Sequence, residues 1–327
     1  MTSAPLPHDP LWPRAGSWPA PSSEATGSPA DLALIGVPTW RTSLSTTGAH
    51  ATPAAVRDAL RRYSPALMSR RSSLSRPPLP VEQEPVDLGA LAVVDHGDVP
   101  EPDGPEGESR ARAAVAAALG ADRTRARAVV ALGGDNALTV PVALGAWGDD
   151  LPTAGLVTVD AHYDLRDGVS NGSPVRRLVE AGLDPARIVQ VGIADFANSA
   201  AYARRARDLG ITVVTLDDLR RRGPGALDDV VREALDVAGA AGGPVHLDVD
   251  VDVCDRAVAP GCPASVPGGL AAWELRALVR EVARDGRVRS VDVAEVDATA
   301  DAPDGRTVRL AALCVLEVLA GLALRAR

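Results

Sequence analysis

Short apolar runs alternate along most of the chain with longer segments in which apolar residues recur at helical spacing. The runs predict strands at 31–37, 91–94, 128–132, 155–159, 188–193, 212–215, 245–251 and 288–296. The segments between them predict helices at 52–63, 109–119, after Asn136, and at 175–181, 199–209, 225–240, 271–283 and 310–324. Strands that alternate with helices form parallel sheets with helices on both faces. The pattern therefore predicts one α/β domain over residues 31–327.

The remaining segments are rich in proline and polar residues. Residues 1–30 are predicted to form a loose arm, although Trp12-Pro13 and Trp18-Pro19 indicate that it docks somewhere on the domain. Residues 65–85 are predicted to be a surface excursion, and 100–108 a flexible acidic connection.

Polar side chains follow the strand predicted at 155–159, in the segment Asp160-Ala-His162-Tyr-Asp164. Residues two apart on an extended backbone point the same way, so three donors for a divalent metal leave one face of the chain. In parallel sheets ligands bind beyond the carboxyl ends of the strands. A single aspartate there would be explained by a turn cap, but three donors favour a metal site.

A second acidic cluster, Asp248-Val-Asp250-Val-Asp252, ends the strand predicted at 245–251. Carboxylates crowded on one buried strand repel one another, so a cation is their natural partner. A network of arginine salt bridges is the alternative. Two such strand ends side by side predict a two-metal site.

Composition excludes several classes of protein. A net charge of −9 and a pI near 5.1 argue against binding to nucleic acid or to anionic membranes. The chain has no lysine, which excludes a P-loop lysine and a Schiff-base lysine. Three cysteines without a CxxC pair, and no apolar leader, predict a reduced, cytoplasmic protein. The apolar run 310–324 is interrupted by Glu317 and is shorter than the roughly 20 residues of a membrane span.

Several ordered motifs together resemble the ureohydrolases, the family of arginase, agmatinase and formimidoylglutamase. The motifs are Asp95-His-Gly-Asp98, Gly133-Gly-Asp-Asn136, Asp160-Ala-His-Tyr-Asp164, Asp250-Val-Asp252 with Asp255 and Ala259-Pro-Gly261, Pro267-Gly-Gly-Leu270, and Asp292-Val-Ala-Glu295. The resemblance covers about residues 31–325. It implies a three-layer α/β/α fold with a mainly parallel eight-stranded sheet, assembled as a trimer or hexamer.

The resemblance also implies two Mn²⁺ ions and their ligands. The metal ligands implied are Asn136, Asp160, His162, Asp164, Asp250 and Asp252, with Asp160 and Asp250 bridging the ions. Asp248 then lies outside the ligand set. Asp164 would also act in catalysis by orienting the attacking hydroxide and passing a proton to the leaving nitrogen, and Glu295 would face the cationic group of the substrate.

Two positions depart from the family pattern. Asn136 stands where relatives supply a histidine ligand, and a neutral amide oxygen binds Mn²⁺ more weakly than imidazole does. Asn171, in Ser170-Asn-Gly-Ser173-Pro, stands where agmatinase-like relatives carry a histidine proton shuttle, and asparagine does not titrate. These losses keep a catalytically degenerate, non-enzymatic member of the family as an alternative.

The segments Asp164-Leu-Arg166 and Gly192–Ser199 look more like formimidoylglutamase than like arginase or agmatinase. Arg166 is predicted either to clamp a substrate carboxylate with its planar fork or to pair with Asp167. Asn198 is predicted either to contact the substrate or to cap the helix that begins at Ser199. Asn171 and Ser173 complete the expected substrate contacts. The small-molecule substrate expected is N-formimidoyl-L-glutamate, from histidine breakdown, with agmatine or a guanidino acid as the alternative.

Overall fold

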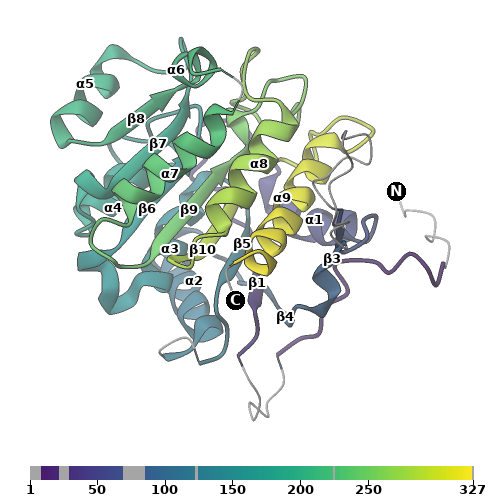
Figure 1. The fold of residues 1–327 in the computed structure, drawn as a ribbon. Coiled ribbons are helices and arrows are strands. Elements are labelled where there is room, and N and C mark those ends of the chain that lie inside the picture. Colours follow the sequence, from purple (N-terminus) through teal and green to yellow (C-terminus); the bar gives the residue numbers. More distant parts are fainter. Residues whose placement is uncertain (1–8, 22–28, 69–84, 122–123, 224, 326–327) are drawn as a thin grey trace, which may run out of the picture.

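A computed structural model of the chain describes residues 9–21, 29–68, 85–121, 124–223 and 225–325. A parallel sheet of eight strands runs through its centre (Figure 1). In spatial order the strands are β4 (Val93–Asp98), β1 (Leu32–Val37), β5 (Val129–Gly133), β10 (Val288–Ala294), β9 (Val245–Asp250), β6 (Gly155–Val159), β7 (Ile188–Ile193) and β8 (Thr212–Thr215). All seven neighbouring pairs are parallel. The eight strands predicted from the apolar runs are thus the eight strands of the sheet.

Helices cover both faces of the sheet and complete the three-layer architecture (Figure 1). One face carries α1 (Thr52–Leu60), α6 (Leu216–Arg221), α7 (Ala226–Ala238), α8 (Ala272–Ala283) and α9 (Arg306–Ala323). The other carries α2 (Gly104–Leu119), α3 (Thr139–Trp147), α4 (Pro174–Glu180) and α5 (Ala200–Leu209). Single-turn and 3₁₀ segments occupy Ala49–Ala51, Leu88–Ala90, Asn136–Leu138, Gly148–Thr153, Pro185–Arg187 and Val251–Val253.

The alternation of side chains along each strand explains why both faces are apolar. In β5, Val130 and Leu132 pack into the core under α1 and α9, while Val129 and Ala131 pack under α2 and α3. Every residue of β5 is therefore buried, as expected for a central strand of a parallel sheet. Such a strand has no amphipathic alternation and reads as a continuous apolar run.

Some boundaries differ from the sequence prediction. The acidic connection predicted at 100–108 is partly helical, because α2 begins at Gly104 with Pro105 and Glu106 in its first turn, where both residues are favoured. Helix α9 begins at Arg306, earlier than predicted, because the Asp301 carboxylate accepts hydrogen bonds from the amides of Thr307 and Val308. Helix α6 was not predicted.

The described part of the N-terminal segment, residues 9–21, packs on the domain. The amide of Ala15 donates to the carbonyl of Tyr63 at 2.9 Å, and the carbonyl of Pro19 accepts from the amide of Asp95 at 2.9 Å. The Ala15 side chain is buried. Most of the excursion predicted at 65–85 lies outside the described residues, and its two flanks pair as β2 (Ala66–Leu67) and β3 (Val86–Asp87).

The motif Asp95-His-Gly-Asp98 belongs to β4, at an edge of the sheet. Arg57 of α1 donates to both oxygens of Asp95, at 2.7 and 2.9 Å, and also to Asp98. This motif therefore stabilises the packing of α1 against the sheet edge. It does not reach the carboxyl ends of the central strands.

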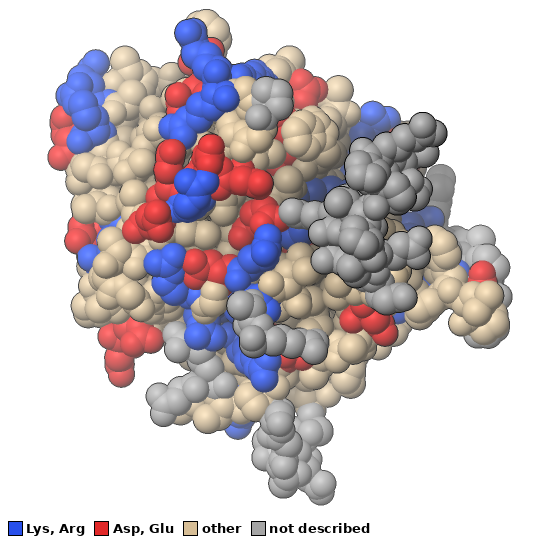
Figure 2. Space-filling model, viewed as in Figure 1, with Lys and Arg blue, Asp and Glu red and all other residues tan. Residues whose placement is uncertain are grey.

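Basic and acidic side chains are interspersed on the outer face of α6, α7 and α8 (Figure 2). Arginines there pair with carboxylates three or four residues away, as in Arg221 with Asp217 and Arg284 with Glu281. No helix among the described residues is long and apolar enough to cross a bilayer.

Candidate active site

The carboxyl ends of β6 and β9 lie side by side near the middle of the sheet. Asp160 follows the last residue of β6, and Asp250 is the last residue of β9. Asp160, His162 and Asp252 each offer a metal-ligand atom, and these atoms lie within 4.8 Å of one another. Nδ1 of His162 is 2.9 Å from Oδ2 of Asp252 and 3.5 Å from Oδ1 of Asp160. The fold therefore brings together the two acidic clusters that the sequence separates by about ninety residues.

Burial and mutual repulsion govern the charges of this cluster. Burial raises the pKa of Asp160 to about 6, and the charge of Asp252 adds to the shift. The pKa values of Asp164 and Asp250 are raised well above the usual range for the same reasons. Burial alone would lower the pKa of His162, but the charges and hydrogen bonds of Asp252 and Asp160 outweigh it and raise that pKa to about 12. Without a metal ion, the imidazolium of His162 is the cation among these carboxylates.

The donor set fits a divalent cation. Asp160 is fully inaccessible to solvent, and its Oδ2 has no hydrogen-bond partner among the described residues. A buried oxygen left unpaired is costly, so it requires an ion or water. Carboxylate oxygens with one imidazole nitrogen are ligands that Mn²⁺ accepts. Asp164 and Asp250 line a cavity together with His162 and Asp252 of this cluster.

Asn136 lies in the 3₁₀ turn after β5 and joins three groups of the site. Its Nδ2 donates to Oδ2 of Asp164 at 2.8 Å, and its backbone amide donates to Oε1 of Glu295 at 2.8 Å. Its Oδ1 accepts from the hydroxyl of Thr139 at 2.7 Å. The amide oxygen that the sequence suggested as a metal donor is thus bound to Thr139, and the side chain acts here as a hydrogen-bond partner of Asp164.

Glu295 is fixed at one of its two oxygens. Oε1 accepts from the backbone amide of Asn136 and from Nδ2 of Asn171, both at 2.8 Å. Oδ1 of Asn171 in turn accepts from the amide of Leu44 at 3.0 Å, so the loop after β1 is tied to the same group. Burial, followed by the charge of Asp135, raises the pKa of Glu295 to about 8, against the hydrogen bonds from the two asparagines.

Asp164 and Glu295 both adopt backbone conformations that are rare for residues with a side chain. Their φ angles are +52° and +60°, in the left-handed region that favours glycine. Such conformations cost of order 1–3 kcal/mol and persist where the surrounding structure enforces them, typically at functional sites. The backbone of Glu295 is held by a neighbouring loop: its amide donates to the carbonyl of Gly134 at 2.9 Å. Gly134 is itself closely packed, since an added Cβ there would lie 2.2 Å from the carbonyl oxygen of Thr39.

His162 and Asp252 of this cluster line a cavity of about 640 Å³, whereas Asp160 is inaccessible and does not line it. Together with Asp164, Asp250 and Glu295 they make up the acidic part of the lining, which we name the acidic floor. Further lining comes from the loops after β1, β6 and β7 and from α5, including Leu44, Arg166, Asn171, Asn198, Tyr202 and Arg205. The cavity is large enough for a small polar ligand.

The remaining substrate-binding candidates differ in position. Arg166 lines the cavity, and Asp167 is paired with Arg205 at 2.8 Å, so the pairing of Arg166 with Asp167 considered from the sequence is not formed. Ser173 does not line the cavity: it is inaccessible, and its hydroxyl donates to the carbonyl of Ser170 at 2.8 Å and accepts from the amide of Ser170 at 3.0 Å. The predicted contact of Ser173 with the substrate is therefore not supported by this structure. Its side chain instead closes the loop before α4 by hydrogen bonds to Ser170.

Asn198 lines the cavity but uses its amide to hold loops together. Its Oδ1 accepts from the amide of Tyr163 at 3.1 Å, and its Nδ2 donates to the carbonyl of Ala161 at 2.8 Å. Ser199, not Asn198, caps α5. Asn198 thus positions the segment that carries His162 and Asp164.

Sequence reasoning missed Tyr202, Arg205 and the loop residues Leu44 and Ser45, all of which line the cavity. Leu44 and Ser45 lie in the polar loop that follows β1. Because ligands bind beyond the carboxyl ends of parallel strands, the position of this loop could have predicted that it lines the site. No comparable signal marks Tyr202 and Arg205, because they lie on an amphipathic helix.

Comparisons with known proteins agree with this geometry. The model of the family described as "Arginase family" matches residues 30–321. A formimidoylglutamase of Halalkalibacterium halodurans is 32% identical over 293 residues, 88% of this chain and 86% of that protein. The crystal structure of the formimidoylglutamase of Bacillus subtilis superposes with a TM-score of 0.84 at 28% identity, covering 100% of this chain and 97% of that one. A formiminoglutamase of Trypanosoma cruzi, solved with Mn²⁺, shares the fold at 23% identity, with a TM-score of 0.75 over 91% and 95% of the chains.

A parallel α/β/α fold with imidazole and carboxylates gathered at the ends of its central strands defines a hydrolase of the ureohydrolase class. The chain belongs to the arginase family.

Proposed function

We propose that the protein is a Mn²⁺-dependent hydrolase that converts N-formimidoyl-L-glutamate and water into L-glutamate and formamide. The observation that carries the proposal is the polarity of the cavity, which has an acidic floor and Arg166 in its lining. A substrate with an amidine at one end and carboxylates at the other matches this arrangement. The names of the relatives at 32% and 28% identity support the same substrate.

Two Mn²⁺ ions are proposed, in keeping with the donor set. Asp160, His162, Asp250 and Asp252 would hold one ion, and Asp160, Asp250 and Asp164 the other, with Asn136 beside it. The second ion would have only weak support from Asn136, whose amide oxygen accepts from Thr139. When bound, the ions would supply Lewis acidity that activates water for attack on the amidine carbon.

Asp164 is the proposed proton carrier. Its Oδ2 is held by Nδ2 of Asn136 at 2.8 Å, which leaves Oδ1 to accept a proton from the attacking water. The same proton is passed to the glutamate nitrogen as its bond to the amidine carbon breaks, so the amine leaves in a neutral form.

Glu295 is proposed to orient the amidine. Two amides hold its Oε1, so Oε2 is available to accept an N–H of the substrate. Because the carboxylate is already fixed, little conformational entropy is lost when it meets the amidinium. Asn171 supports this role by hydrogen bonding, since its amide cannot carry a proton as a histidine would.

A product assay tests the proposal. Protein incubated with Mn²⁺ is supplied separately with N-formimidoyl-L-glutamate, agmatine, L-arginine and 3-guanidinopropionate, and formamide, urea and ammonia are measured. Formamide and L-glutamate in equal amounts, released from the first compound, are the expected result. If urea is released from a guanidino compound and no formamide is released from N-formimidoyl-L-glutamate, the substrate is a guanidino compound instead. No product from any of them, with Mn²⁺ bound, would favour the non-enzymatic alternative.

The setting proposed is cytoplasmic, in a homo-oligomer, with the reaction belonging to histidine breakdown. Cys254, Cys262 and Cys314 are free and buried, which fits a reducing compartment. Size measurement by light scattering tests the assembly.

A further inference from the structure

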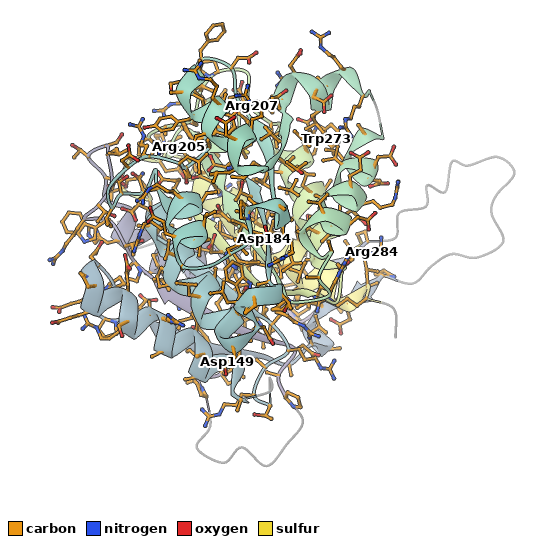
Figure 3. All side chains as sticks on the ribbon, turned by 90° about the vertical axis from the view of Figure 1, so that its left-hand side faces the viewer. Asp149, Asp184, Arg205, Arg207, Trp273 and Arg284 are labelled. Atoms are coloured by element: carbon orange, nitrogen blue, oxygen red, sulfur yellow. The ribbon has the colours of Figure 1, made fainter. Side chains whose placement is uncertain are left out.

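Two guanidinium groups flank one aromatic ring in the lining of the cavity. The Cζ atom of Arg166 lies 6.0 Å from the ring centroid of Tyr202, and the Cζ atom of Arg205 lies 5.7 Å from it. Arg166 comes from the loop after β6, whereas Tyr202 and Arg205 come from α5. Of the three, Arg205 is labelled in Figure 3. All three residues line the cavity. Stacking on a ring fixes the plane of a guanidinium and leaves its edge for hydrogen bonds.

Arg166 has no side-chain hydrogen bond or ion pair to any residue in the described part of the chain, although four arginines of α4 and α5 do. The absence of a side chain at Gly172 gives it room: an added Cβ there would lie 2.7 Å from Cδ of Arg166. The guanidinium is therefore an exposed charged group in the lining of the cavity, and its hydrogen bonds are left to water. Such a group is matched by an anion on the ligand.

Arg205 is held by one of its nitrogens. Its Nη1 donates to the carbonyl of Leu165 at 2.6 Å and to Oδ1 of Asp167 at 2.8 Å. Nε and Nη2 make no such bond with the described residues, so one edge of the fork remains for a ligand. The Asp167 side chain is 82% exposed, so water screens its charge, and it neutralises Arg205 only in part.

We propose that Arg205 forms a second carboxylate subsite beside Arg166 and thereby selects substrates with two carboxylates. Arg166, two residues from Asp164, binds the carboxylate next to the amidine, and Arg205 binds the distal side-chain carboxylate. This inference rests on the proposed function and refines it. It separates a dicarboxylate such as N-formimidoyl-L-glutamate from guanidino acids with one carboxylate and from agmatine, which has none.

Kinetics with a matched pair of substrates test the subsite. N-formimidoyl-L-glutamine replaces the distal carboxylate by a neutral amide of similar size. The wild-type protein is expected to prefer the glutamate compound by about 10- to 100-fold in kcat/KM, since a hydrogen-bonded charge pair is worth about that factor. In Arg205→Gln this preference should fall to less than about threefold, chiefly through a higher KM for the glutamate compound.

Arg204→Gln is the matched control, because Arg204 is an exposed arginine on the same helix that does not line the cavity. It should keep the wild-type preference. Arg166→Gln should weaken both substrates alike and so keep the preference too. Because Arg205 also holds the Leu165 carbonyl, Arg205→Lys serves as a second variant: it retains the charge and should keep part of the preference. A wild-type protein without preference, or an Arg205→Gln variant with the full preference, would overturn the subsite.

Calorimetric binding to the Mn²⁺-loaded protein distinguishes this failure from failure of the proposed function. Glutarate and L-glutamine are titrated into the wild-type and Arg205→Gln proteins. Glutarate binding that is lost in Arg205→Gln, without hydrolysis of N-formimidoyl-L-glutamate, would support the subsite and refute the proposed reaction. Hydrolysis together with glutarate binding that is unchanged in Arg205→Gln would support the reaction and refute the subsite.

Discussion

The side-chain amide of Asn171 donates to Oε1 of Glu295 at 2.8 Å, joining two residues that are 124 positions apart. The same asparagine accepts from the amide of Leu44 at 3.0 Å, so one side chain couples the loop after β1, the loop before α4 and the end of β10. Asn171 thus has a structural role in orienting the carboxylate of Glu295.

Asn171→Ala should therefore lower kcat while the fold is preserved. The substitution leaves Glu295 with one hydrogen bond fewer and releases the Leu44 amide, and a hydrogen bond to a charged group is worth about 1.5–3 kcal/mol, or roughly 10- to 100-fold. Steady-state kinetics would measure the loss. Val169→Ala, in the same loop at an exposed position, is the control and should behave as wild type. A kcat for Asn171→Ala within about twofold of wild type would show that Glu295 does not need this bond.

Asn136→His should increase the amount of tightly bound Mn²⁺. Imidazole is a better donor to Mn²⁺ than an amide whose oxygen already accepts from Thr139. After dialysis against metal-free buffer, elemental analysis should find more Mn²⁺ per chain in the variant than in the wild type. Equal occupancy of both proteins would mean that Asn136 does not limit the binding of either ion.

Asp250→Ala should remove both bound metal and activity, whereas Asp248→Ala should leave much of both. Asp250 lines the cavity next to the metal-ligand cluster, but Asp248 faces Asp292 and Thr158 on the neighbouring strands, deeper in the sheet. Metal analysis and a product assay on the two variants decide between them. The reverse result would show that the ligands on β9 are shifted by two residues.

Asp248→Asn should stabilise the protein after metal removal. Neither carboxylate oxygen of Asp248 has a hydrogen-bond partner among the described residues, and burial, followed by the charge of Asp292, raises its pKa well above the usual value. A carboxyl whose pKa is raised in the folded state costs stability once the pH exceeds its unfolded value of about 4. The cost grows as the pH rises toward the folded pKa.

The gain from Asp248→Asn should accordingly be small near pH 4 and larger at neutral pH. Urea unfolding of the EDTA-treated variant and wild type at several pH values measures the difference in free energy. A gain that shrinks as the pH rises would contradict the burial of an uncompensated carboxyl at this position.

Binding of Mn²⁺ should release protons, and its affinity should rise with pH. In the metal-free protein the pKa of His162 is raised to about 12, so its ring carries a proton at neutral pH, whereas a metal ligand must be the neutral imidazole. The raised pKa values of Asp160 and Asp164 act in the same direction. Calorimetry in buffers with different ionisation enthalpies counts the released protons. Affinity that is constant from pH 6 to pH 8.5 would contradict this account.

Much of the architecture could be predicted from local patterns. Each strand of a parallel sheet is buried on both faces, so it appears as a short apolar run, and all eight were found in this way. The position of Asp160 and His162 also followed from local rules, because side chains two apart after a strand leave on the same side. Helix starts are harder to predict from local patterns, since the start of α9 depends on the carboxylate of Asp301, several residues before the helix.

The sequence by itself determined the fold class and the candidate metal ligands at the ends of β6 and β9, because both follow from the spacing of residues that are close together in the chain. Only the tertiary structure decided that Asn136 and Asn171 converge on Glu295, that Arg205 rather than Arg166 pairs with Asp167, and that Ser173 is turned away from the cavity. For the two asparagines the physical reason is that the spatial order of the strands brings loops more than a hundred residues apart to the carboxyl ends of the sheet. For Arg205 and Ser173 it is the packing of α5 and of the loop before α4, which the spacing of residues does not specify.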